Sequence, residues 1–143
     1  MATDRRAEVT WHGSLMEGSG TITSTSTGAI GQQQVSWPAR SEEPSDQTSP
    51  EELIAAAHAA CFSMALSHVL AEAGSPPEEL KSGATVTFEP GTGITKIALT
   101  VRGTVPGLDE EGFREAAEGA RAGCPVSQAL AGVPEVTVDA SLA

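Results

Sequence analysis

The sequence predicts an α+β fold in one domain spanning residues 1–143. Strand-like and helix-like segments occur in separate runs, which favours α+β over a doubly wound parallel sheet. One long helical segment, residues 50–73, is apolar around its whole circumference and therefore predicts a buried central helix. A chain of this length buries about two-thirds of the surface that its unfolded form exposes, so it folds without a metal or a disulfide.

Three short strands are predicted before this helix. Residues 7–11 alternate weakly between apolar and polar side chains, residues 20–27 are rich in Thr and Ser, and residues 33–37 form the third strand-like segment. Glycines mark the turns between them, so we expect an antiparallel meander. A polar loop follows at residues 38–49, and its length marks it as a candidate functional loop.

The long helix has clear start and stop signals. Ser49 is a suitable N-cap, Pro50 suits the first helical position, and Glu52 completes a capping box with Ser49. Gly74 ends the helix, which at 1.5 Å per residue is roughly 36 Å long. A surface helix has a polar face, and this one has none over four turns. One small sheet cannot cover every side of it, so the sequence predicts an intimate homodimer.

The rest of the chain predicts two strands, two helices and a last strand. Asp109 caps the first of these helices, and Pro125 begins the second, short one, with Cys124 at or beside its cap. The two strands are joined by a Pro-Gly-Thr-Gly turn, and the second alternates between apolar and polar side chains. In order, the strands span residues 84–89, 94–105 and 135–142.

Charge and composition exclude several kinds of partner. The formal net charge is −11, which argues against binding to nucleic acid or to an anionic membrane surface. We find no run of about 20 apolar residues, so we expect no membrane span. The first residues lack the apolar region of a secretory signal, which predicts a cytoplasmic protein. In that compartment two cysteines are reactive groups more often than a permanent cross-link.

Cys61 and Cys124 are the candidate reactive groups, although a buried cysteine otherwise behaves as a small apolar side chain. Backbone N–H groups at a helix start favour a thiolate at Cys124. Burial among Ala and Met side chains keeps Cys61 protonated, so a nucleophile there requires a nearby cation. Arg40, in the segment before the helix, is the candidate cation, and Glu51 is the carboxylate that would hold its guanidinium.

The spacing of these residues constrains the candidate site. Glu51 and Cys61 are ten residues apart, about 15 Å along one straight helix. They share a site only if Arg40 bridges part of the gap, if the helix bends, or if a second subunit contributes one of them. We favour a site at the dimer interface. Taken alone, Arg40 is an ordinary loop arginine and Glu51 a favourable charge at a helix start.

His58 lies one turn before Cys61, so a Cys–His nucleophile pair is conceivable beside the plainer interpretation of a packed helix histidine. His68 is roughly 10 Å from Cys61 along the helix axis and cannot share a metal with it by local geometry. The sequence contains no close Cys/His cluster of the zinc type, no P-loop, no dinucleotide fingerprint and no GxSxG motif.

Two motifs resemble one family. "SPEELIAAAHAACFSMAL" and, some sixty residues later, "AGCPVSQAL" are similar to the OsmC/Ohr superfamily of osmotically inducible and organic hydroperoxide resistance proteins. "GQQQVSWPAR" and "ITKIALTVRGTVPGLD" resemble its osmotically inducible branch more closely. The resemblance covers nearly the whole chain. It implies an intertwined homodimer in which the cysteine helices are central and buried and antiparallel sheets lie outside.

The resemblance also implies a thiol-dependent peroxidase acting on organic hydroperoxides and, less efficiently, on hydrogen peroxide. By motif, Cys61 matches the peroxidatic cysteine, Cys124 the resolving cysteine, Arg40 the active-site arginine and Glu51 its carboxylate partner. Arg102 is a distant alternative to Arg40. The family uses no metal, haem or flavin, and a dithiol such as protein-bound dihydrolipoamide is its expected reductant. Two alternatives stay open: a non-catalytic cysteine redox sensor, and a Cys–His hydrolase.

Overall fold

The computed structural model describes all of residues 1–143 and divides into two compact units, Met1–Pro50 and Glu51–Ala143. The first unit contains strands β1 (Ala7–His12), β2 (Ser19–Thr25) and β3 (Gln33–Val35). They pair antiparallel in sequence order, which confirms the predicted meander.

A short helix, α1 (Trp37–Ser41), follows β3, so the predicted loop begins with helical backbone. The Ser36 hydroxyl caps it by accepting from the Ala39 N–H, and a proline lies in its first turn. Five residues are too few to show a helical period in the sequence, which is why the pattern predicted a strand end and a loop here.

The second unit is built around α2 (Pro50–Glu72), which begins and ends as predicted to within a residue. The later elements are listed here: β4 (Glu79–Glu89), β5 (Gly93–Thr104), α3 (Glu110–Gly123), α4 (Pro125–Ala129) and β6 (Glu135–Leu142). The Asp109 carboxylate accepts from the Gly112 N–H, which confirms the predicted cap of α3. β4 begins five residues before the predicted start because its polar first residues pair along the full length of β5.

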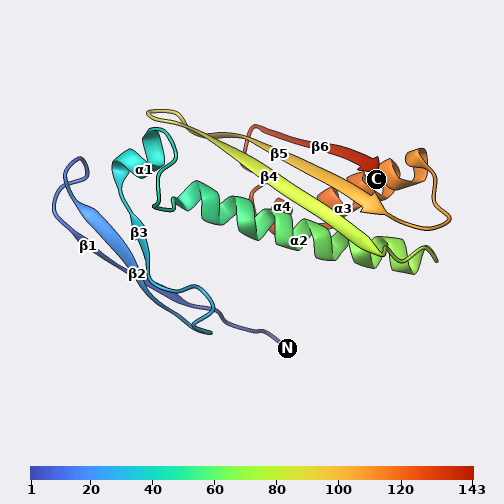
Figure 1. Ribbon diagram of the computed structural model, residues 1–143, viewed down its shortest axis with the longest axis horizontal. Coiled ribbons are helices and arrows are strands. Elements are labelled where there is room, and N and C mark those ends of the chain that lie inside the picture. The colour runs from blue at the N-terminus through green and yellow to red at the C-terminus, as the bar shows by residue number, and fades with distance from the viewer. The chain divides into compact units, whose positions relative to one another are not determined.

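The second sheet has the order β4-β5-β6 and is mixed, so the expectation of wholly antiparallel sheets is wrong for this unit. β4 and β5 form an antiparallel hairpin, whereas β6 runs parallel to β5. Between β5 and β6 the chain passes through α3 and α4 before it returns to the sheet (Figure 1). Such a helical crossover is the connection that a parallel pair requires.

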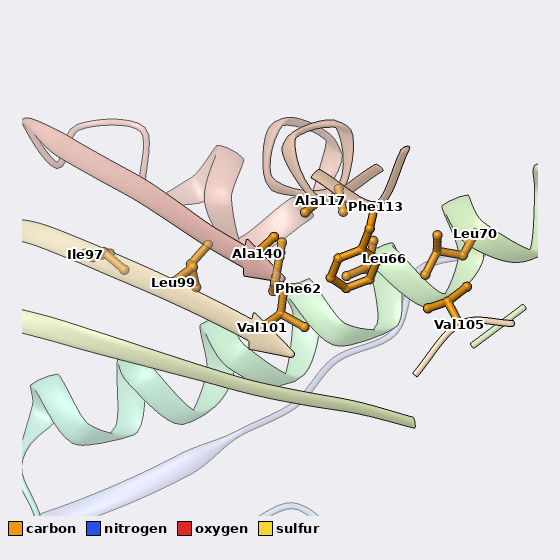
Figure 2. Close-up of a cluster of buried hydrophobic side chains, with 11 residues drawn as sticks. Phe62, Leu66, Leu70, Ile97, Leu99, Val101, Val105, Phe113, Ala117 and Ala140 are labelled. Carbon is orange, nitrogen blue, oxygen red and sulfur yellow. The ribbon is translucent and has the colours of Figure 1, made fainter. Parts of the chain in front are cut away.

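The core of the second unit lies between one face of this sheet and the two longer helices (Figure 2). The apolar side chains of the predicted alternation along β5 are buried on one face of the sheet. They meet the buried side chains of α2 and α3, so both helices cover the same face of the sheet. The main contributors are Phe62, Leu66, Leu70, Ile97, Leu99, Val101, Phe113 and Ala117. Each large apolar side chain that is buried in this way contributes roughly 1.5–3 kcal/mol.

Within one chain α2 is buried along one stripe only, so the expected burial on every side is not seen in the single chain. The buried positions recur every fourth residue, as in His58, Phe62, Leu66 and Leu70. Small apolar residues lie exposed on other parts of the helix, together with Met64, which is 73% exposed.

α2 is also long and apolar enough to cross a membrane by length and composition, which corrects the expectation that no such segment exists. Counting uninterrupted apolar residues missed this helix. Isolated His and Ser residues interrupt the apolar run, but the mean hydropathy of the helix remains high. Length and composition are weak evidence, because the core helix of a soluble protein passes the same test. α2 has such a core stripe in Phe62, Leu66 and Leu70.

Close packing between β5 and α3 predicts that Gly103→Ala destabilises the protein. A Cβ atom at Gly103 would lie 2.5 Å from the Phe113 ring, and overpacking of this kind costs about 1–3 kcal/mol. Gly119→Ala is the matched control, because this exposed α3 glycine has nothing within 4 Å of its Cβ position. There alanine should stabilise the helix by about 0.5–1 kcal/mol. Urea denaturation measures both changes, and equal effects at the two positions would contradict the packing argument.

Candidate active site

The two cysteines lie together in the second unit. Cys61 is on α2, and Cys124 is the residue between α3 and α4. Their Sγ atoms are 2.9 Å apart, although 63 residues separate them in the sequence. Both thiols are free. A disulfide has an S–S length of about 2.05 Å, so the pair becomes a cross-link after only a small movement.

Local backbone geometry places Cys124 at this point. Its backbone is extended, with φ −64° and ψ 123°, so it ends α3 and serves as the N-cap of α4. Its N–H donates to the Ala120 carbonyl, and its own carbonyl accepts from the Gln128 N–H. Pro125 occupies the first turn of α4, where a missing N–H costs nothing. Cys124 therefore lies at a break between two helices, as the sequence predicted.

The two thiols differ in exposure and in acidity. Cys124 is fully buried, whereas Cys61 is only partly buried. Burial raises the pKa of Cys61, and the neighbouring Cys124 raises it further. Burial alone would raise the pKa of Cys124 too. Hydrogen bonds with Cys61, with the Ser127 N–H and hydroxyl, and with the Val126 N–H outweigh that effect, so its pKa is lowered. Within residues 51–143, the neighbouring groups therefore favour the thiolate of Cys124 over that of Cys61.

The structure places the other two predicted site residues in different units. Arg40 is partly buried in the last turn of α1, in the first unit. Glu51 is 6% exposed in the first turn of α2. Figure 1 shows α2 as one continuous helix, so a bend does not bring Glu51 to Cys61. The participation of Arg40 and Glu51 in the site stays a prediction.

His58 is fully buried, and its Nε2 atom is 2.7 Å from the Ser127 hydroxyl. Its Nδ1 atom has no hydrogen-bond partner. Burial lowers the pKa of His58 below its ordinary value of 6.5, so the ring is neutral at neutral pH. The spacing along α2 indicated His58 as a candidate partner of Cys61, whereas Ser127 was missed. The signal for Ser127 was available, because it lies three residues after Cys124 on the same short helix.

One cavity lies away from the cysteines. It has a volume of about 570 Å³ and lies between the second half of α2 and the start of β4, where Met64, His68 and Leu80 line it. A second cavity of about 350 Å³ is lined by Arg121, Ser127 and neighbouring residues. The chemistry of the side chains, and not cavity size, therefore identifies the site. No group of three or more His, Cys, Asp or Glu side chains is placed to hold a metal ion.

A buried thiol next to a partly exposed thiol, both free and in contact, defines a dithiol redox protein. The family model described as OsmC-like protein matches residues 43–139, and the chain belongs to this family. It is 43% identical to peroxiredoxin OsmC of Escherichia coli strain K12, over 99% of both chains. It is also 33% identical to the organic hydroperoxide resistance protein of Xanthomonas axonopodis, over 65% of this chain and 66% of that protein.

Solved structures agree with this assignment. The organic hydroperoxide resistance protein OhrB of Bacillus subtilis superposes with a TM-score of 0.65 at 29% identity, covering 96% of this chain and 98% of that one. The organic hydroperoxide resistance protein of Elizabethkingia anophelis superposes with a TM-score of 0.69 at 26% identity, covering 99% and 100%. The resemblance seen in the sequence motifs is thereby confirmed, as is the α+β class of the fold.

Proposed function

We propose that this protein is a thiol-dependent peroxidase that reduces organic hydroperoxides and, less efficiently, hydrogen peroxide. The observation that carries the proposal is the 2.9 Å contact between the free sulfurs of Cys61 and Cys124. The names of the relatives support it, since one is a peroxiredoxin and others are organic hydroperoxide resistance proteins.

In the proposed reaction the Cys61 thiolate attacks one peroxide oxygen, the O–O bond breaks, and the alcohol leaves. Cys61 is thereby oxidised to a sulfenic acid. Cys124 then attacks the Cys61 sulfur, a disulfide forms, and water leaves. The difference in exposure supports these proposed roles, because Cys61 is partly accessible, whereas Cys124 is fully buried and shielded from an external peroxide.

A dithiol reductant of the dihydrolipoamide type completes the cycle in this proposal. Reduction proceeds by attack of an external thiolate on one sulfur of the disulfide. Since Cys124 is buried, the attack falls on Cys61 and releases Cys124 as the leaving thiolate. The second thiol of the reductant then displaces Cys61. The hydrogen bonds that lower the pKa of Cys124 favour its release, because a thiol of lower pKa leaves faster.

Arg40 and Glu51 have supporting roles in the proposed site. Because burial raises the pKa of Cys61, its thiolate needs a nearby cation. No described contact within residues 51–143 places a cation beside Cys61. The Arg40 guanidinium is our candidate. Glu51 is 6% exposed, and a carboxylate so buried is stabilised by a charged or hydrogen-bonding partner. We propose that it orients the guanidinium.

We further propose a soluble, cytoplasmic homodimer in which the two compact units of each chain work as one domain, residues 1–143. The curated relative from Escherichia coli matches across both units, which supports a single functional domain. Small and apolar residues of α2 are exposed in the single chain, and Met64 is 73% exposed, so this surface is suited to burial in an interface. A second copy of α2 provides one, since small side chains let two helices approach closely.

The two alternatives make different demands on the site. A Cys–His hydrolase needs His58 to accept the Cys61 proton, whereas the Nε2 atom of His58 bonds Ser127. A redox sensor needs the same two cysteines as the peroxidase but is oxidised once and then stops. Continuous turnover with a dithiol present therefore separates the enzyme from the sensor.

Substitution of each cysteine should affect a different step. Cys61→Ser should abolish the loss of an alkyl hydroperoxide in the presence of dihydrolipoamide. Cys124→Ser should still be oxidised by one equivalent of peroxide but should accumulate the Cys61 sulfenic acid, which dimedone traps. A peroxide assay and mass spectrometry of the intact protein check the two outcomes. Full turnover by Cys61→Ser would overturn the proposal, and ester hydrolysis that survives in Cys124→Ser would favour the hydrolase.

Loss of Arg40 should make Cys61 harder to ionise. An adjacent opposite charge shifts a pKa by about 1–3 units, so Arg40→Met should lower the rate of Cys61 alkylation at neutral pH by about tenfold or more. The measurement uses the Cys124→Ser background, so that only Cys61 reacts. Arg102→Met, on β5, is the matched control and should leave the rate unchanged. The reverse pattern would identify Arg102 as the cation instead.

A charge on the exposed face of α2 should disrupt the dimer. Met64→Glu places a carboxylate twice in the proposed interface, so sedimentation should show the mass of one chain in place of two. Thr100→Glu, on the exposed face of β5, is the control and should remain dimeric. A wild-type protein with the mass of one chain would refute the dimer directly.

A further inference from the structure

His58 is a buried titratable group that the steps above do not use. It lies on α2 one turn before Cys61, and no part of it is exposed to solvent. A polar side chain buried in an apolar helix costs free energy unless it is hydrogen-bonded. Its one described bond, from Nε2 to the Ser127 hydroxyl at 2.7 Å, joins α2 to the helix that follows Cys124, across 69 residues of sequence.

Ser127 is bonded to this imidazole and follows the buried thiol by three residues. Cys124 is the N-cap of α4, and Ser127 is the third residue of that helix. Side chains at these two positions lie on the same side of the first turn, as in a capping box. A serine hydroxyl has one proton and two lone pairs, so it can accept a proton from one neighbour while it donates to the other. The side chains thus follow in the order His58, Ser127, Cys124, Cys61.

We propose that His58, acting through the Ser127 hydroxyl, takes the proton from Cys124 when the disulfide forms. His58 and Ser127 are then positioning residues for the second step of the cycle. The inference rests on the proposed peroxidase function for its place in the reaction, and on the geometry of residues 51–143 for the relay itself.

The protons and electrons balance as follows. The Cys124 thiol donates its proton to Ser127 Oγ, and the hydroxyl proton of Ser127 passes to His58 Nε2. The Cys124 thiolate attacks the Cys61 sulfur, the S–S bond forms, and the S–O bond of the sulfenic acid breaks. The departing hydroxide takes up one proton, which His58 returns through Ser127, and leaves as water.

Two further observations agree with the relay. Burial lowers the pKa of His58, so the ring is neutral at neutral pH and one of its nitrogens carries a lone pair. The Ser127 hydroxyl is among the groups that lower the pKa of Cys124 despite its burial. In this relay His58 takes the proton of Cys124 through Ser127. The ionisation of Cys61 depends on a different group.

The experiment separates the two oxidation steps. Reduced protein is mixed rapidly with one equivalent of tert-butyl hydroperoxide, and the Cys61 sulfenic acid and the disulfide are quantified by dimedone trapping and mass spectrometry. Ser127→Ala should slow disulfide formation by about 100-fold, the lower range for general acid–base catalysis, and should slow sulfenic acid formation far less. Ser127→Thr, which keeps the hydroxyl, should restore the second step.

His58→Gln tests the other end of the relay, because glutamine can bond Ser127 but cannot accept a proton at neutral pH. It should show the same slow second step as Ser127→Ala, and the double variant should be no slower than either. His68→Gln, which is exposed on the same helix, is the control and should match the wild type. Disulfide formation at the wild-type rate in Ser127→Ala, or equal slowing of both steps, would overturn the relay.

A second measurement is independent of peroxide chemistry. In the Cys61→Ser background, the rate of iodoacetamide alkylation of Cys124 against pH reports the ionisation of that thiol. The relay predicts that Ser127→Ala and His58→Gln move this profile to higher pH, while His68→Gln does not. Unmoved profiles overturn the relay. If the wild-type protein consumes no peroxide, the proposed function fails, and the alkylation profiles still decide the relay.

Discussion

The contact between the Cys61 and Cys124 sulfurs, 2.9 Å apart, is the interaction on which the rest of the site depends. No local feature produces it, because α2 carries one sulfur and the break between α3 and α4 carries the other. Core packing holds the two together. Phe62, next to Cys61, and Phe113, on α3, belong to the same buried cluster, so the position of α3 against α2 sets the distance between the sulfurs.

Burial raises the pKa of both thiols, but the net shifts are opposite because the neighbouring hydrogen bonds differ. At Cys61 burial and the neighbouring Cys124 outweigh the hydrogen bond from the Val126 N–H, and the pKa is raised. At Cys124 the first N–H groups of α4 and the Ser127 hydroxyl outweigh burial. One thiol is thereby accessible but hard to ionise, and the other is ionisable but inaccessible. Such a division suits a two-step reaction, provided that a cation such as Arg40 stabilises the Cys61 thiolate, as the start of α4 stabilises the Cys124 thiolate.

The crossover from β5 to β6 links this chemistry to the fold. The chain leaves the sheet through α3, turns at Cys124 and returns through α4 to pair in parallel with β5. The cysteine therefore lies at the turn of the crossover, where it faces α2. The alternation of apolar residues in β6 is the same for either pairing direction, so the sequence pattern did not distinguish the parallel pairing from the expected antiparallel one. The route of the connection decides the direction, and that route is a property of the folded chain.

The sequence by itself determined the features that a few neighbouring residues encode. Caps and breakers at Pro50, Asp109 and Pro125 set helix starts, alternation along β5 marked its buried face, and the motifs around Cys61 and Cys124 identified the family. Only the tertiary structure decided the contact between the sulfurs, the bond from His58 to Ser127 and the burial of α2 along one stripe. The physical reason is range: caps and hydrophobic periods act within one or two turns, whereas contacts across more than sixty residues depend on how whole elements pack.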